Sequence, residues 1–414
     1  MLTETATEAP GRAGDVAVRL LPRAGANVVT FVLGFDAGSR TESAHEHGCA
    51  HLLEHLVFRG SEAHPSADAV AAAAEEQGMQ IGAHTMHDVV LFHATAPSWS
   101  VDAMVDLLCD VVARPLLRDA DVEAERAVVS HELARAHDSP GWIAGRLLDR
   151  AAFGDHALGR GILGSAASLA AIDGGVVRDF HARRYVSGAA VAVLSGDLER
   201  LDRERLAEAL ARVRTGPAGA SGDPAPAFSS RELIERRATG QCRLGLHWRL
   251  EPCATGLAQR AAVEVYAALL GGSMGSRLFR AIRVERALAY AVGASAWMHR
   301  DATRIDVEVG AAPDRVADVS EAIVAVVEQL AADGPSEAEV RRARAHVVGG
   351  TLLALETTSA IARRSAMDHL LFGHAADPAS DLAALAAVDV ADVTRVARAV
   401  AGAPASACVG PPAA

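Results

Sequence analysis

The sequence contains no lysine, because all 40 of its basic residues are arginine. This absence excludes a Schiff-base lysine, the lysine of a phosphate-binding P-loop and a Ser-x-x-Lys catalytic pair. The five cysteines are odd in number and widely spaced, and no two of them form a Cys-x-x-Cys pair. Neither a thiolate zinc site nor a disulfide framework is therefore indicated.

Basic charge and long apolar runs are also scarce. The 52 acidic residues outnumber the basic ones and give a net charge of −12, so the basic footprint of a nucleic-acid-binding protein is missing. No uncharged apolar run approaches the roughly 18 residues of a membrane span, and the N-terminus lacks the pattern of a secretory signal. We expect a cytoplasmic protein that binds neither nucleic acid nor membrane.

The chain is too long for one small domain, since its 414 residues exceed the roughly 250–300 over which a single core grows. Residues 215–230 are rich in Gly, Pro, Ala and Ser and have no apolar period, which predicts a linker. It would separate an N-terminal domain, residues 1–214, from a C-terminal domain, residues 231–414. The similar size of these halves suggests an internal duplication.

The two halves show the same order of patterns. In each half a strand-like stretch is followed by a helical region, a second strand, an amphipathic helix and a charged helix with capping residues at its start. The expected elements are strands at residues 27–35 and 241–250, strands at 89–96 and 303–310, amphipathic helices at 101–112 and 316–330, and charged helices at 119–135 and 336–348. This order predicts an α+β fold of two homologous domains, each an antiparallel or mixed sheet with helices packed on one face.

A dense histidine cluster lies in the first half. His51, Glu54 and His55 form an H-x-x-E-H motif, the reverse of the H-E-x-x-H of many zinc peptidases. Histidines four residues apart share one helix face and suit a zinc ion, while Glu54 is placed to act as general base toward water at the metal. His45 and His47 precede the helix and are expected to be dispensable. Chance produces such a short motif in a chain like this with a probability on the order of a few per cent, so a third ligand is required.

The third ligand comes from a resemblance. Residues 123–132 read EAERAVVSHE and lie in the expected charged helix, with 76 residues between His55 and Glu132. This combination resembles the pitrilysin, insulysin and mitochondrial-processing-peptidase family, which pairs H-x-x-E-H with a distal glutamate at about this spacing. The resemblance implies one zinc ion per chain, with His51, His55 and Glu132 as ligands, Glu54 as the base and Glu125 as a supporting carboxylate.

Further segments fit the same family. They are residues 38–42 (GSRTE), 58–60 (FRG), 163–165 (LGS) and 194–197 (LSGD) in the first half, and residues 271–292 in the second. Within the last segment, the resemblance implies that Arg283 and Tyr290 hold the substrate backbone near zinc. At the place of the metal helix the second half has an apolar helix, residues 257–272, so no second zinc site is expected.

Residues 79–85 are expected to form a substrate-binding edge. In relatives the corresponding segment is an unpaired strand to which an extended peptide adds as a further strand. Relatives usually have Asn-Ala where this chain has Gly82 and Ala83. An extended peptide is thus the expected substrate, and the specificity of relatives is not carried over.

The leading hypothesis is a zinc-dependent endopeptidase that cuts unfolded peptides or leader (pre-sequence) segments inside an enclosed chamber. Single-chain relatives have four such domains, so a chain with two would need a second chain to complete the chamber. Because both signatures are present, a homodimer is expected, with a heterodimer containing a zinc-less paralogue as the alternative. The competing hypothesis is a non-catalytic structural or binding subunit, a class that typically lacks a motif residue; none is missing here.

Overall fold

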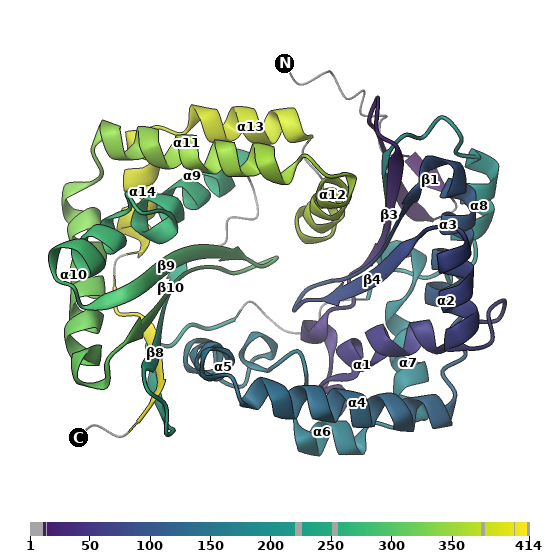
Figure 1. Cartoon of the computed structure of the whole chain (residues 1–414), viewed down its shortest axis with the longest axis horizontal. Coiled ribbons are helices and arrows are strands. Elements are labelled where there is room, and N and C mark those ends of the chain that lie inside the picture. The colour runs from purple at the N-terminus through teal and green to yellow at the C-terminus, as the bar shows by residue number, and fades with distance from the viewer. Residues whose placement is uncertain are drawn as a thin grey trace. The chain divides into compact units, whose positions relative to one another are not determined.

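The chain folds into two units, each built around one sheet (Figure 1). The computed structural model describes residues 11–13, 15–219, 226–250, 256–373, 377–400 and 402–411, so part of the expected linker lies outside the described residues. The first unit comprises Met1–Leu133, Gly161–Asp223 and Ala354–Asp377, and the second comprises Ala134–Arg160, Pro224–Leu353 and Pro378–Ala414. Each unit therefore contains one segment from the other half of the sequence. Residues 354–377 belong to the first unit, and residues 134–160 belong to the second.

The sheet of the first unit is mixed. Its strands lie in the order β1 (Gly11–Ala13), β2 (Val16–Pro22), β6 (Ala190–Gly196), β3 (Val28–Phe35), β5 (Val90–Pro97) and β4 (Gln80–Thr85). Strands β2 and β6 are parallel and the other neighbours are antiparallel. Strand β4 is an edge strand, as expected for residues 79–85.

The second sheet repeats this connectivity. Its order is β7 (Glu232–Arg236), β11 (Ala405–Gly410), β8 (Cys242–Leu250), β10 (Thr303–Ala311) and β9 (Ala289–Met298), with β7 and β11 parallel. Setting aside the short β1, both sheets have the chain-order pattern first, last, second, fourth, third. The predicted duplication and the α+β class are confirmed, and the four expected strands begin and end within one residue of the observed ones.

Helices cover both faces of the first sheet. They are α1 (Cys49–Leu56), α2 (Ala67–Glu76), α3 (Val101–Ala113), most of α4 (Asp119–His137), α6 (Ala166–Ala171), α7 (Gly174–Arg184), α8 (Arg203–Leu210) and α12 (Thr358–Phe372). Phe58, which follows α1, contacts Phe92 on one face. Ala362 and Ala366 of α12 pack against Val32 on the other face. Strand residues alternate between faces, so α1 and α12 lie on opposite sides of this sheet.

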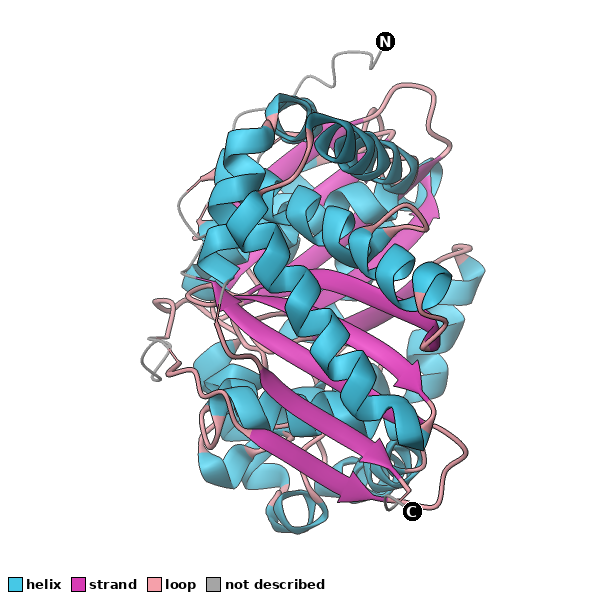
Figure 2. Cartoon of the chain, turned by 90° about the vertical axis from the view of Figure 1, so that its left-hand side faces the viewer, coloured by secondary structure: helices cyan, strands magenta, loops and turns pink. Residues whose placement is uncertain are grey.

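The second unit follows the same plan. Its helices are α5 (Pro140–Phe153), α9 (Leu257–Ala267), α10 (Val316–Asp333), α11 (Glu337–Ala354), α13 (Pro378–Ala387) and α14 (Val390–Val400), several of which lie across the sheet in Figure 2. Trp248 and Ile305 form its main core with Ile323 of α10. On the opposite strand face, Ile143 of α5 packs against Val409. Within the described part of the chain, each sheet thus has its main helical layer on one face, as predicted, and one additional helix on the other.

The additional helices come from the other sequence half. Helix α12 follows α11 in the chain but packs on the first sheet, whereas α5 follows α4 but packs on the second. The inner strands of the sheets are apolar on both faces, so helices must pack against each face to exclude water. None of the described helices is long and apolar enough to span a membrane.

Candidate metal centre

The metal helix α1 begins at a backbone turn that favours glycine. Gly48, its N-cap residue, has φ of 98° and offers no side chain to accept hydrogen bonds from the first turn. The buried carboxylate of Glu42 takes that role, accepting from the N–H groups of Gly48 at 3.0 Å and Ala50 at 2.7 Å. The nearby Arg40 forms a buried ion pair with Asp88 at 3.2 Å. The GSRTE segment therefore fixes where the metal helix starts.

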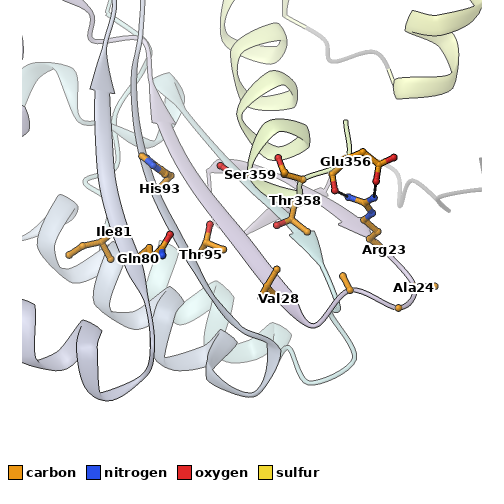
Figure 3. Close-up of a pocket in the computed structure, with 13 residues that line it drawn as sticks. Arg23, Ala24, Val28, Gln80, Ile81, His93, Thr95, Glu356, Thr358 and Ser359 are labelled. Atoms are coloured by element: carbon orange, nitrogen blue, oxygen red, sulfur yellow. Dashed lines mark hydrogen bonds and ion pairs between the residues drawn. The ribbon is translucent and has the colours of Figure 1, made fainter. Parts of the chain in front are cut away.

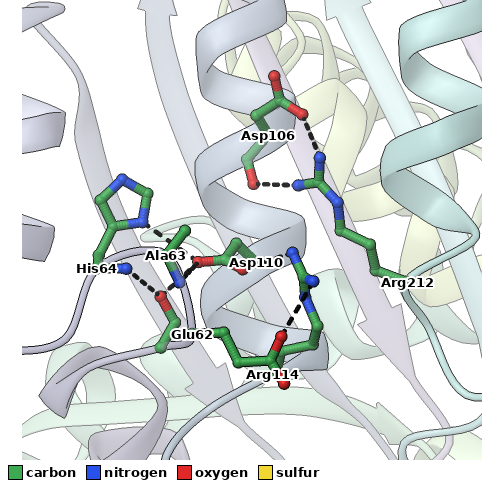
Figure 4. A network of polar contacts seen from close by, with 8 residues as sticks. Glu62, Ala63, His64, Asp106, Asp110, Arg114 and Arg212 are labelled. Carbon is green, nitrogen blue, oxygen red and sulfur yellow. Dashed lines mark hydrogen bonds and ion pairs between the residues drawn. The ribbon is translucent and has the colours of Figure 1, made fainter.

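The segment after α1 is held by a polar network on α3 (Figure 4). The carboxylate of Asp110 accepts from the Ser61 hydroxyl and the Ala63 N–H, and it contacts His64 and Arg114. Burial opposes the charge, but these hydrogen bonds keep the pKa of Asp110 below its ordinary value. One buried carboxylate thus anchors the start of the metal helix, and another anchors the segment that follows it.

Two histidines and one glutamate converge above α1. Leu52, Leu53 and Leu56 are buried, so the helix turns its other face, with His51 and His55, toward α4. The Nε2 atoms of both imidazoles lie 3.8 Å from the same oxygen, Glu132 Oε2. One ligand atom from each of the three residues falls within 4.8 Å of the others. The structure thus brings together the two histidines that helical spacing placed on one face and the glutamate that the family resemblance implied.

This cluster fits a metal ion. Glu132 Oε2 is buried and accepts no hydrogen bond, an arrangement that costs free energy unless a cation or donor binds there. Burial lowers the pKa of His51, which favours the neutral imidazole that coordinates metals. Two nitrogen ligands and one carboxylate, with a position left open, are the donor set of catalytic zinc sites.

Glu125 supports the cluster from α4. This carboxylate is buried, and its Oε2 lies 3.2 Å from Nδ1 of His55, the ring nitrogen turned away from Glu132. Its Oε1 lies 3.5 Å from Arg59. Glu125 thereby fixes the orientation of the His55 ring. The contact with Arg59 was not foreseen, although Arg59 lies in a segment that resembles the family.

Glu54 has a partner that the sequence did not reveal. Its Oε2 accepts a hydrogen bond from the hydroxyl of Thr85, the last residue of the edge strand β4. Glu54 itself is not part of the three-residue cluster. The hydrogen bond ties the carboxylate expected to act as base to the strand expected to bind substrate.

The sequence and the fold of the chain are similar to those of known peptidases. Residues 19–166 match the model of the insulinase family (peptidase family M16), and residues 171–347 match the model of the peptidase M16 inactive domain. A protein named as an uncharacterized zinc protease from Mycobacterium bovis is 32% identical over 87% of this chain and 83% of its own length. Another with that description, from Streptomyces coelicolor, is 30% identical over 92% of this chain and 84% of its own length. The crystal structure titled peptidase M16 inactive domain from Pseudomonas fluorescens superposes with a TM-score of 0.90 at 20% identity, covering 98% of each chain, and supports the fold alone.

The chain belongs to the insulinase family of peptidases. The resemblance to this family that the sequence motifs indicated is confirmed. The relatives named above are described as zinc proteases. The match of the second half to an inactive-domain model agrees with the absence of an H-x-x-E-H motif there.

The remaining site residues of this insulinase-family chain fall in both units. Arg283 and Tyr290 are in the second unit, where the guanidinium carbon of Arg283 lies 4.4 Å from the centre of the Tyr290 ring. Tyr290 is 78% exposed. His45 contacts the Ser43 hydroxyl and His47 contacts the Gly161 carbonyl, so neither joins the metal cluster.

Gly82 and Ala83 lie in the edge strand, as expected. Gly82 pairs with His93 of β5 and Ala83 pairs with Phe92. Gly82 has no side chain, and the His93 ring occupies the space where a side chain would begin. A Cβ on Gly82 would lie 3.0 Å from His93 Cε1.

Proposed function

We propose that this chain is a zinc-dependent endopeptidase that cleaves unfolded peptides or leader segments bound in extended form. The observation that carries the proposal is the convergence of His51 and His55 on a buried oxygen of Glu132 that accepts no hydrogen bond. The hydrogen bond from Thr85 to Glu54 also links a carboxylate of the metal helix to the edge strand β4. The zinc-protease descriptions of its relatives support the same activity.

The roles of the protein groups follow from their contacts. When bound, a zinc ion would polarise the scissile carbonyl and acidify water. Glu54 takes the proton from the attacking water and returns it to the leaving amine, as general base and then general acid. The Thr85 hydroxyl orients the Glu54 carboxylate, and Glu125 orients the His55 ring.

The substrate is proposed to add to strand β4. This strand is paired on one side only, so its other side offers backbone donors and acceptors to an extended peptide. Gly82 and Ala83 lie in the middle of it, with Thr85 at the end nearest Glu54. Main-chain pairing requires an extended and locally unfolded peptide, and it makes few demands on the peptide's sequence.

Arg283 and Tyr290 are proposed to hold the substrate backbone in the chamber of a dimer. Tyr290 is exposed and carries the Arg283 guanidinium over its ring, so the pair forms one preassembled surface. We propose that a second copy of the chain presents this pair to the zinc site. A heterodimer with a zinc-less paralogue is the alternative assembly.

The replacement Glu54→Gln tests the catalytic proposal. Gln keeps the size of the side chain but cannot accept the proton, so peptide cleavage should fall by roughly 10²–10⁴ while zinc content is unchanged. Cleavage of a diverse peptide mixture would be followed by mass spectrometry, and bound zinc by elemental analysis. Glu123→Gln is a matched control, because Glu123 is an exposed acid of α4 whose carboxylate forms an ion pair with Arg126.

The competing function is that of a non-catalytic subunit. It predicts that zinc-loaded wild-type protein cleaves nothing in the mixture, or that Glu54→Gln cleaves as well as wild type because the activity is a contaminant. Either result would refute the peptidase. Inhibition of peptide cleavage by chelators, with activity restored by added zinc, would support the peptidase function.

A further inference from the structure

The edge strand β4 has a second face, turned away from the metal helix. Side chains of a strand alternate between the faces of its sheet. Thr85 contacts Glu54 of α1, whereas the adjacent His84 contacts Arg363 of α12 at 3.1 Å. Gln80, Gly82 and His84 therefore face the α12 side. A peptide added to β4 would direct every second side chain to that side.

A cluster of basic groups lies on the α12 side. The rings of His84 and His93 stack with centroids 5.5 Å apart and an interplanar angle of 14°. A guanidinium only donates hydrogen bonds, so His84 Nε2 accepts from Arg363. Among the described residues no carboxylate forms an ion pair with Arg363, and its one hydrogen-bond partner is this imidazole. The charge of Arg363 is therefore left without an anion.

His93 is placed to receive a ligand. Its Nδ1 is buried and has no hydrogen-bond partner. Burial, followed by the charge of Arg363, lowers the pKa of His93 to about 4. A neighbouring anion would relieve the electrostatic part of this shift.

Gly82 gives a substrate side chain access to this cluster. His93 is the partner of Gly82 in the neighbouring strand, one strand inward from the edge. A side chain on residue 82 would meet the His93 ring, since even its Cβ would lie 3.0 Å from Cε1 and 3.4 Å from Nε2. With glycine there, the His93 ring lies over residue 82, and a substrate side chain opposite this residue can approach the imidazole with no other side chain between them.

The adjoining cavity provides room for such a side chain (Figure 3). It has a volume of about 710 Å³ and is lined by Gln80, His93 and Thr95 of the sheet and by the start of α12, including Thr358. Its one acidic lining residue, Glu356, forms an ion pair with Arg23 at 3.6 Å. The first-turn N–H groups of α12 at this wall add positive potential.

We propose that Gly82, His84, His93 and Arg363 form a substrate subsite that selects an acidic side chain, Asp or Glu, on the substrate residue opposite Gly82. The subsite rests on the proposed peptidase function and specifies its substrate class. The acidic side chain meets the His93 ring over Gly82 and accepts charge-assisted hydrogen bonds from Arg363 and an imidazole. Side chains that point to the zinc side of the sheet do not reach it.

The test compares matched peptides. A cleaved peptide would be resynthesised with Glu or Gln at each position in turn, from four residues before the cut to four after it. Glu should raise kcat/KM over Gln by about tenfold at one position, and by much less at the positions next to it. Binding of the same pair to zinc-loaded Glu54→Gln protein, measured by fluorescence anisotropy, should show the same ratio without turnover.

Variants identify the residues responsible. Arg363→Gln and His93→Gln should each bring the Glu-to-Gln ratio close to one, and Arg363→Glu should make an Arg peptide better than a Glu peptide at the same position. Arg205→Gln is the matched control, since it removes one Arg charge from the same unit at a side chain paired with Asp106, and it should leave the ratio unchanged. A ratio near one at all eight positions, in an enzyme whose cleavage depends on Glu54, would overturn the subsite alone. A wild-type protein that cleaves no peptide would instead overturn the proposed function.

Discussion

At the scale of single residues, the site depends on carboxylates that hold other groups in place. Glu42 caps the metal helix, Asp110 anchors the segment after it, and Glu125 orients His55. All three are buried or largely buried, and each accepts at least one hydrogen bond or ion pair. Buried charges of this kind are tolerated only with such partners. They hold the metal helix, the segment after it and the His55 ring in place.

The supporting role of Glu125 can be measured directly. Glu125→Ala should lower zinc affinity by about 10- to 100-fold, because His55 loses the acceptor that fixes its ring and tautomer. Competition with a chromophoric chelator gives the affinity, and circular dichroism checks folding. Glu123→Ala, on the exposed side of the same helix, should bind zinc like the wild type. An unchanged affinity in folded Glu125→Ala protein would contradict the role.

The sequence predicted those site residues whose relation is local or recorded in a family pattern. His51, Glu54 and His55 follow from helical spacing, while Glu132 and Glu125 required the resemblance because 76 residues separate the second histidine from the third ligand. Thr85 was missed as a partner of Glu54. Its contact depends on how strand β4 lies against α1, and neither propensity nor spacing specifies that packing.

At the scale of elements, the strands and helices that carry a strong apolar period were predicted closely. The destinations of α5 and α12 were not predicted, because a helical pattern shows which face is apolar but not which sheet it covers. Arg304 of β10 illustrates the missing information: it donates to Asp149 of α5 at 2.7 Å, across 155 residues of sequence. Such long-range partners define the units and are invisible in a local pattern.

The start of α11 yields a prediction on acid stability. A hydrogen bond from Arg277, reinforced by the capping contacts of Ser336, lowers the pKa of Glu339 to about 2 from the ordinary 4.5. The folded state therefore holds this proton less tightly than the unfolded state. Its stabilisation is complete above about pH 4.5 and is lost as the pH falls toward about 2.

Glu339→Gln should consequently lower the melting temperature at neutral pH, and the difference from wild type should shrink as the pH falls below about 4.5. Gln retains the capping geometry and removes only the charge. Differential scanning calorimetry across this range measures the effect. Glu337→Gln changes an exposed acid in the same turn and is the control. A Glu339→Gln difference that stays constant from pH 7 to pH 2 would show that the ion pair does not contribute as argued.

At the scale of the whole molecule, the proposed chemical roles are divided between the two duplicated units. Both units share one strand connectivity, yet the H-x-x-E-H motif lies in the first and the Arg283–Tyr290 pair lies in the second. Tyr290 lies at the start of β9, the edge strand that corresponds to β4 in the first sheet, and Arg283 lies in the preceding helical segment, Phe279–Glu285. One chain thus carries both parts of the proposed chamber, and two copies related by a twofold axis would contain two complete sets.

Mixing two inactive variants tests whether the parts act between chains. Glu54→Gln removes the base and Tyr290→Phe removes the hydroxyl proposed to hold the substrate, and each should be strongly impaired alone. After subunit exchange, half of the dimers are mixed, and one of the two sites in each mixed dimer combines an intact base with an intact tyrosine. Activity should therefore return to about one quarter of the wild-type rate per subunit, as expected for isologous pairing with random exchange. Exchange would be verified by native mass spectrometry of differently tagged chains. A mixture that exchanges subunits but stays as inactive as its components would show that the pair does not act across the dimer, and a fully active monomer would exclude a shared chamber.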